Sequence, residues 1–168
     1  KNDIKFKNAY FNKYRNIWHH GDYAEIKSTD GFVIYGRSDT TLNPGGVRLG
    51  TAEIYSEVEK FREIREAIAV GQSWDNDIRI VLFIIMNKNF SINDNLIKEI
   101  KKQIRKNASP RHVPSKIIVV KDIPRTKSGK IVELAVKNTI EGNKIKNREA
   151  LLNPEVLEEY KNLKELEY

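Results

Sequence analysis

The chain has 168 residues, which is enough for one compact domain or for a domain joined to part of another. Hydrophobic residues make up 39%, and no apolar run approaches the roughly 18 residues of a membrane-spanning helix. The formal net charge is +7, and the absence of cysteine excludes disulfide scaffolds, zinc ribbons and cysteine nucleophiles. Because the sequence also shows no secretory leader pattern, we expect a cytoplasmic protein.

The first part of the chain, residues 1–38, is expected to be rich in strands. Residues 23–26 alternate, residues 28–31 carry turn-forming side chains, and residues 32–35 have the composition of a second strand. Another turn follows at 43–46, where two adjacent glycines favour positive φ angles or close approach of the backbone to a neighbouring group.

A more regular pattern begins at Thr51, a suitable helix N-cap, because apolar residues then recur at helical spacing. Two strands are predicted at 67–71 and 78–86, and the second contains the longest apolar run, as a buried strand does. Ser91, with Asp94 three residues later, predicts the start of the next helix. The apolar stripe of that helix consists of Leu96, Ile97, Ile100 and Ile104.

The last part of the pattern predicts a third strand at 116–120 and a loop at 124–130. A helix at 131–141 should end at Gly142, and a final helix should begin with Asn153 as its cap. From residue 51 the order is therefore α-β-β-α-β-α-α. Short connections between these elements predict an α+β domain, a small sheet of about three strands with helices packed on it.

Positive charge is concentrated in residues 98–130, where eleven Lys and Arg side chains face two acidic ones, a local charge of +9. Such a surface attracts polyanions: nucleic acid, an anionic membrane, or phosphates of ATP or coenzyme A. A basic nucleic-acid-binding module is therefore one hypothesis for this chain. A solvated helix face is the alternative that predicts no partner.

Three clusters have the residue types of a binding site. The first is the basic loop at 124–130, which ends in Gly-Lys but lacks the residues of a phosphate-binding P-loop. The second is the segment at 36–54, where Arg37 and Arg48 flank a glycine-rich turn and suit phosphate or ribose contacts. The third is His19-His20-Gly21-Asp22, where the scarcity of other ligands argues against a metal. Taken alone, the loop at 124–130 is also explained by an ordinary surface lysine without a ligand. Taken alone, the segment at 36–54 is also explained by a salt-bridged β-hairpin.

Together, and in this order, the clusters resemble the adenylate-forming superfamily of acyl-CoA synthetases, luciferases and peptide-synthetase adenylation domains. The matching motifs are Gly-Asp at 21–22, Gly-Arg-Ser-Asp at 36–39, Gly-Val-Arg at 46–48 and Pro-Arg-Thr-Lys-Ser-Gly-Lys at 124–130. The resemblance covers nearly the whole chain. It implies that the chain is the C-terminal portion of such an enzyme, which by itself we expect to be inactive.

Within this superfamily, the segments at 18–22, 46–55 and 109–114 most resemble the acetoacetyl-CoA synthetase branch. Two departures are His20, where the family usually has Thr, and Lys127-Ser128, which looks more like the acetyl-CoA branch. An acetyl- or propionyl-CoA synthetase therefore stays an alternative. The resemblance implies ATP, coenzyme A and a small carboxylic acid as substrates, and a magnesium site in a large N-terminal domain.

The resemblance also implies roles for single residues in the nucleotide-dependent step. Asp22 matches the residue that binds the ribose hydroxyls, and Arg37 matches its ribose-contacting neighbour. Arg48 matches the arginine near the α-phosphate. Lys130 matches the adenylation lysine, which stabilises the charge that develops as the carboxylate attacks the phosphate.

Three further residues are implied in the second step and in the motion between the steps. Gly46 matches the glycine that lines the pantetheine tunnel, and Arg105 matches a contact to the nucleotide phosphate of coenzyme A. Asp39 matches the hinge. Residues 1–38 are then expected to end the large N-terminal domain, and residues 39–168 to form the small mobile C-terminal domain.

Overall fold

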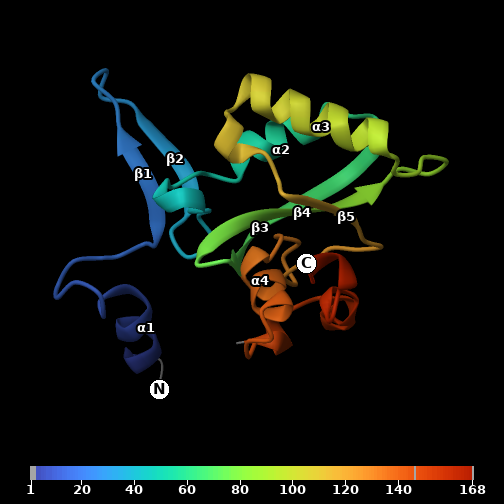
Figure 1. Cartoon of the computed structure of the whole chain (residues 1–168). Helices are drawn as coiled ribbons and strands as arrows, with labels where there is room; N and C mark the ends of the chain where they lie inside the picture. The colour runs from blue at the N-terminus through green and yellow to red at the C-terminus, as the bar shows by residue number, and fades with distance from the viewer. Residues whose placement is uncertain (1–2, 146, 168) are drawn as a thin grey trace.

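A computed structural model describes residues 3–145 and 147–167 and contains two separate sheets (Figure 1). The helices are α1 (Asp3–Tyr10), α2 (Ala52–Val58), α3 (Asp94–Asn107) and α4 (Glu133–Ile140). The strands are β1 (Asp22–Ile26), β2 (Phe32–Arg37), β3 (Ile64–Trp74), β4 (Asp77–Met86) and β5 (Lys116–Val119). Short 3₁₀ segments lie at Pro44–Gly46, Pro110–His112, Arg148–Ala150, Pro154–Tyr160 and Lys164–Leu166. The predicted α+β fold with a three-stranded sheet is confirmed.

The larger sheet has the order β3-β4-β5. Strands β3 and β4 are antiparallel and are joined by Asp75 and Asn76, both with positive φ (47° and 58°). A two-residue turn of this kind matches the twist of a hairpin, and Asp and Asn tolerate it. Strands β4 and β5 are parallel, so the chain crosses from one to the other through α3.

Side chains of β4 alternate between two hydrophobic cores, one on each face of this sheet. Ile80, Leu82 and Ile84 pack with α2 and α3. Val81, Phe83 and Ile85 pack with α4 and the C-terminal 3₁₀ segments. Both faces are thus covered, as Figure 1 shows, and this explains the continuous apolar run seen in the sequence.

Helix α3 carries its apolar stripe on the sheet side, with Leu96, Ile100 and Ile104 buried. Its start was predicted wrongly. The side chain of Asn93, not Ser91, accepts the hydrogen bond from the N–H of Leu96. Likewise Thr51 precedes α2 but makes no capping bond with its side chain.

The final helix predicted from Asn153 is a 3₁₀ segment, and Asn153 does not cap it. The amide of Asn153 instead accepts from the N–H of Arg125 (2.9 Å) and donates to the carbonyl of Ile123 (3.0 Å). Tyr160, fully buried, donates to the carbonyl of Asp122 (2.8 Å). The tail is therefore bonded to the segment that precedes the basic loop.

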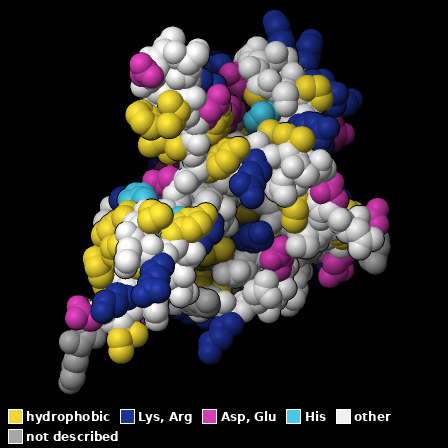
Figure 2. All heavy atoms as spheres, turned by 90° about the vertical axis from the view of Figure 1, so that its left-hand side faces the viewer, with side chains coloured by type: hydrophobic (Ala, Val, Ile, Leu, Met, Phe, Trp, Pro, Cys, Tyr) yellow, Lys and Arg dark blue, Asp and Glu magenta, His cyan; other side chains and the backbone are white. Residues whose placement is uncertain are grey.

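Residues 3–37 stand apart from the sandwiched sheet (Figure 1). The expectation of strands is confirmed for the β1–β2 hairpin, but α1 was not predicted. The hairpin exposes large apolar side chains, with Ile26 67% and Phe32 71% exposed. Figure 2 shows hydrophobic side chains gathered on this side of the molecule.

Candidate functional site

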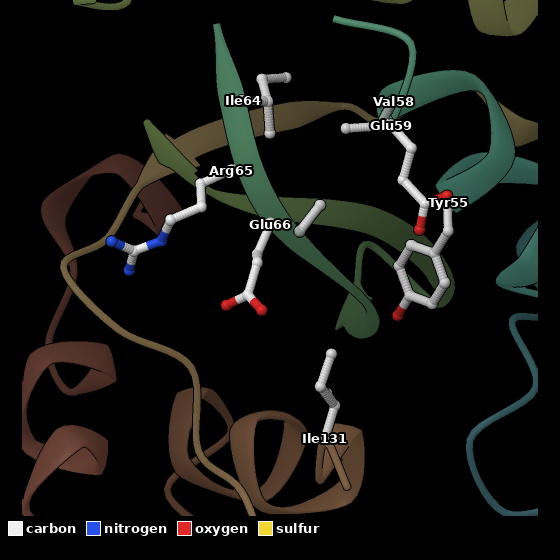
Figure 3. A pocket seen from close by; sticks show the side chains of 8 residues that line it. Tyr55, Val58, Glu59, Ile64, Arg65, Glu66 and Ile131 are labelled. Atoms are coloured by element: carbon white, nitrogen blue, oxygen red, sulfur yellow. The ribbon is translucent and has the colours of Figure 1, made fainter. Parts of the chain in front are cut away.

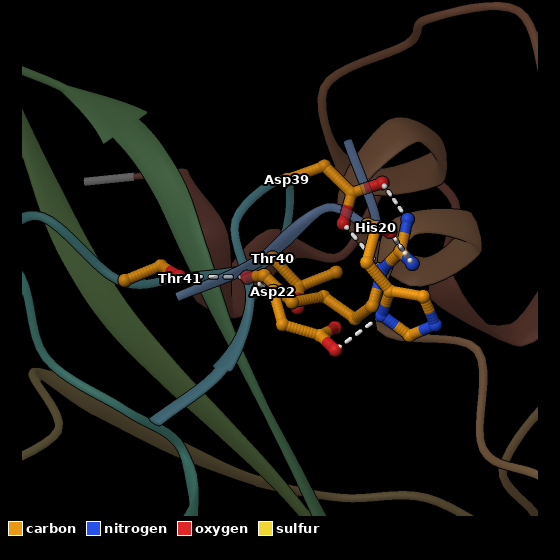
Figure 4. A network of polar contacts seen from close by, with 6 residues as sticks. His20, Asp22, Asp39, Thr40 and Thr41 are labelled. Atoms are coloured by element: carbon orange, nitrogen blue, oxygen red, sulfur yellow. Dashed lines mark hydrogen bonds and ion pairs between the residues drawn. The ribbon is translucent and has the colours of Figure 1, made fainter. Parts of the chain in front are cut away.

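The cluster around Asp22 lies where β1 begins and β2 ends, because Asp22 and Arg37 are direct partners in the antiparallel ladder. Figure 4 shows the side chains that meet there. Nδ1 of His20 is hydrogen-bonded to Oδ2 of Asp22. His20, the residue that departs from the family pattern, thus orients the carboxylate that the sequence assigns to a ribose.

Arg37 connects this cluster to the proposed hinge. Its Nε donates to Oδ1 of Asp39 (3.3 Å), and its Nη1 donates to the carbonyl of His20 (3.2 Å). The hydrogen bond to Asp39, with the nearby Asp22 carboxylate also contributing, raises the pKa of Arg37. The structure therefore brings Asp22, Arg37 and Asp39 together.

Arg48 lies close to the same cluster from another segment. Its guanidinium is 5.6 Å from the ring centre of Tyr23, the residue after Asp22. This distance suits a cation–π contact, and the exposed arginine keeps its donors open to a ligand. Three of the four residues predicted to act in the nucleotide-dependent step thus share one region.

Gly46 lies in the loop before Arg48, with φ of 76° and an exposed backbone. Among the described residues other than its two chain neighbours, no atom lies within 4 Å of a Cβ placed on it. In that part of the chain, the positive φ is what favours glycine at this position. Free space in front of Gly46 is compatible with the predicted tunnel.

Lys130 ends a small hairpin. The N–H of Thr126 donates to the carbonyl of Lys130 (2.8 Å), and the N–H of Gly129 donates to the carbonyl of Thr126 (2.8 Å). The side chain of Lys130 is exposed and, within residues 3–145 and 147–167, forms no ion pair. The backbone of the loop is thus closed into a hairpin, whereas the ammonium is free to meet an anion.

The base of this hairpin is fixed to the sheet. Arg125 forms an ion pair with Glu66 of β3 and lies opposite Ile131 in an isolated bridge. Beside it is a hollow of about 300 Å³. Figure 3 shows the hollow between α2, β3 and Ile131, with the Tyr55 hydroxyl and the Glu66 carboxylate pointing into it.

Glu133, three residues after Lys130, bonds to the segment that follows Arg48. Its Oε1 accepts from the hydroxyl of Tyr55 (2.9 Å) and from that of Thr51 (3.4 Å). Burial raises the pKa of Glu133, and the two hydrogen bonds oppose that shift. The Tyr55 hydroxyl also accepts from the N–H of Ala69 in β3 (3.1 Å).

Arg105 lies in the last turn of α3, exposed among other basic side chains. In the described part of the chain, no hydrogen bond or ion pair joins Arg105 or Lys130 to the Asp22 cluster. The same residues contain no group of three His, Cys, Asp or Glu placed to hold a metal ion. None of the described helices is long and apolar enough to cross a bilayer.

The sequence reasoning missed three residues that position these loops: Asp77, Glu133 and Asn153. Each acts through a partner more than 25 positions away in the chain. Motif spacing contains no signal for such pairs. The only local hint was Asn153-Pro154, which indicated a helix start instead.

Comparison with known proteins supports the family resemblance. Residues 53–130 match the AMP-binding enzyme C-terminal domain family. An acetoacetyl-coenzyme A synthetase of Rhizobium meliloti (strain 1021) is 56% identical over 96% of this chain and 25% of its own length. An acetoacetyl-CoA synthetase of Gallus gallus is 46% identical over 99% of this chain and 25% of its own length. The chain therefore spans about a quarter of the length of these relatives.

Solved structures agree. An acetoacetyl-CoA synthetase from Streptomyces lividans superposes with a TM-score of 0.83 and 37% identity, over 94% of this chain and 24% of that one. A benzoate CoA ligase from Burkholderia xenovorans LB400 shares the fold, with a TM-score of 0.66 and 23% identity over 81% of this chain and 27% of its own. Residues 53–130 therefore belong to the AMP-binding enzyme C-terminal domain family, and the chain as a whole is similar to acetoacetyl-CoA synthetases.

Proposed function

We propose that this chain is the mobile C-terminal part of an enzyme that joins acetoacetate to coenzyme A at the expense of ATP. In the first step the carboxylate attacks the α-phosphate of ATP, forming acyl-adenylate and releasing pyrophosphate. In the second step the thiol of coenzyme A attacks the acyl carbon, forming the thioester and releasing AMP. This activity would place the enzyme in ketone-body and lipid metabolism, in the cytoplasm.

The observation that carries this proposal is that the side chain of Lys130 is exposed and unpaired within the described residues. A closed hairpin presents an exposed ammonium that has no carboxylate partner within the described residues. Preorganised positive charge of this kind stabilises negative charge that develops in a transition state. An ammonium already held in a buried ion pair would not be available for it.

The ribose of the nucleotide would bind at the Asp22 cluster, where a carboxylate oriented by His20 can accept hydrogen bonds from a diol. Arg48, exposed beside Tyr23, would reach the α-phosphate. From the family resemblance, magnesium, the acid and the adenine would bind in the N-terminal domain.

In the second step, coenzyme A would pass Gly46 and place its nucleotide phosphate near Arg105. The open space before Gly46 and the exposed basic end of α3 support this route.

We also propose the division at the hinge: residues 1–38 end the large domain and residues 39–168 form the small one. The two sheets are separate, and Leu42 and Leu49 already belong to the core of the sandwiched sheet. The exposed apolar side chains of the β1–β2 hairpin are suited to contact with the rest of the large domain.

The test is acid-dependent pyrophosphate exchange with the intact enzyme, comparing acetoacetate with acetate and propionate. We expect acetoacetate to give the highest kcat/KM. A preference for acetate or propionate would move the proposal to that branch. Exchange with none of the three acids would reject the ligase assignment.

A further inference from the structure

The Gly45–Gly46 turn is held by groups outside its own loop. The N–H of Gly45 donates to both oxygens of Asp77, each at 2.9 Å. Nη1 of Arg111 lies so near that a Cβ on Gly45 would be 2.8 Å from it. Gly45 therefore lies next to both a carboxylate and a guanidinium, whereas a Cβ on Gly46 would have no described atom within 4 Å beyond its chain neighbours.

Asp77 is a suitable group to hold this turn because it belongs to the sheet. It is the first residue of β4 and pairs with Trp74 across the two-residue turn. The N–H groups of Ile78 and Gly45 lower the pKa of Asp77, with Arg111 also contributing, so the carboxylate stays ionised at neutral pH. A charged acceptor on a rigid strand gives a stronger and better defined bond than a neutral one.

The loop is also closed at its base. Leu42 and Leu49 exchange two backbone hydrogen bonds there (3.0 and 2.8 Å). Residues 45–48 beyond that base are exposed. Asp77 therefore anchors the backbone of the exposed part of the loop to the sheet.

We propose that Asp77 is a positioning residue for thioester formation: it holds the Gly45–Gly46 backbone where coenzyme A has to pass. This inference rests on the proposed function. The lysine hairpin is held by different groups, Glu66 and Asn153. Loss of Asp77 should therefore impair the second half-reaction and spare the first.

The experiment uses the intact enzyme and measures each half-reaction separately, with acetoacetate, ATP and coenzyme A as the probes. For Asp77→Ala we expect the rate of thioester formation from preformed acyl-adenylate to fall about tenfold, with pyrophosphate exchange within twofold of wild type. Asp77→Asn keeps an oxygen that accepts from Gly45, so it should recover most of the lost rate.

Asp75→Asn is the matched control, because it removes the same charge from the same turn and keeps a side chain that tolerates the positive φ at this position. In the described chain the side chain of Asp75 makes no hydrogen bond to the loop. Its rates should equal those of wild type. Equal loss of both half-reactions in Asp77→Ala, no loss at all, or the same loss in Asp75→Asn would overturn the proposal.

A second measurement does not depend on activity. Hydrogen exchange of the Gly45 amide should accelerate in Asp77→Ala and stay slow in Asp77→Asn and Asp75→Asn. Unchanged protection in Asp77→Ala would overturn the anchoring contact itself. A wild-type enzyme with no acid-dependent exchange would instead reject the proposed function, and the amide measurement would still decide the contact.

Discussion

At Lys130 the main chain is hydrogen-bonded within the hairpin, but the side chain is exposed. Its main chain is bonded to Thr126, whereas its ammonium extends into solvent. A side chain in this position can enter a nucleotide site and leave it without any change in its own loop. Such a lysine suits a step that needs positive charge only once per cycle.

Lys130→Ala in the intact enzyme should therefore lower pyrophosphate exchange by about a hundredfold or more, on the scale of a lost transition-state contact. Thioester formation from preformed acyl-adenylate should largely survive. Lys127→Ala, in the same exposed hairpin, is the control and should leave both rates close to wild type. Equal loss of the two half-reactions in Lys130→Ala would reject the assignment of Lys130 to the adenylation step.

His112 is a second residue whose surroundings predict its behaviour. It is 8% exposed, Nδ1 is hydrogen-bonded to the Ser109 hydroxyl (2.8 Å), and Nε2 has no partner among the described residues. Burial lowers its pKa below 6.5, although the Glu53 carboxylate, whose Oε2 also has no partner there, opposes this. The ring should be neutral at pH 7.

Because its pKa is lower in the folded state, His112 contributes stability above pH 6.5 that is lost as the pH falls through the folded value. The free energy of unfolding should therefore decline from pH 7 to pH 5, and less so in His112→Gln. Urea unfolding at several pH values measures this, with the exposed His20→Gln as control. Parallel curves for wild type and His112→Gln would contradict it.

Hydrogen bonds between α4 and the start of α2 connect the lysine hairpin with the Gly46 loop, although the two loops are far apart in the sequence. Glu133 is the first residue of α4, just after the lysine hairpin, and its partners Thr51 and Tyr55 lie directly before α2 and within it, just after the Gly46 loop. Tyr55 also bonds to β3 through the N–H of Ala69. The two loops should therefore move together when the small domain rotates.

Tyr55→Phe removes the donor to Glu133 and the acceptor for Ala69 while keeping the ring. We expect it to lower the free energy of unfolding by about 1–3 kcal/mol, the cost of leaving buried polar groups unpaired. Glu133→Gln keeps an acceptor for Tyr55 and should cost less. Urea unfolding with an unchanged m-value is the measurement, and equal stability of Tyr55→Phe and wild type would refute the network.

On the scale of the whole molecule, two differently built parts meet near Asp39. The sandwiched sheet buries both faces, whereas the β1–β2 hairpin exposes Ile26, Phe32 and Ile34. Between them the chain turns at Arg37, whose carbonyl accepts from the N–H and the hydroxyl of Thr41 (2.9 and 2.6 Å). Rotation about this short segment is the motion that the proposed function requires.

Asp39→Pro tests this motion. Proline fixes φ and removes an N–H, and in the described chain the N–H of Asp39 makes no backbone hydrogen bond outside regular elements. We expect one half-reaction to stay near wild type and the other to fall at least about tenfold, as expected when a hinge cannot turn. Asp39→Ala, which loses the Arg37 ion pair but keeps the backbone free, should retain both. Full overall turnover in Asp39→Pro would reject the hinge.

The sequence by itself determined the resemblance to the family, the α+β class and the order of helices and strands from residue 51 to α4. It could do so because periodicity and motif spacing are local properties of the chain. The continuous apolar run of the sequence forms β4, and Leu96, Ile100 and Ile104 of the predicted stripe are buried in α3, whereas Ile97 is half-buried.

Only the tertiary structure decided how the loops are held. The bonds of Asp77 to Gly45, Glu133 to Tyr55 and Asn153 to Arg125 join residues that are distant in the chain. Asn93, and not Ser91, caps α3. The segment Pro154–Tyr160 is a 3₁₀ helix with Tyr160 buried, and not an α-helix. Such choices depend on which groups burial leaves unpaired, and burial is known only once the chain has folded.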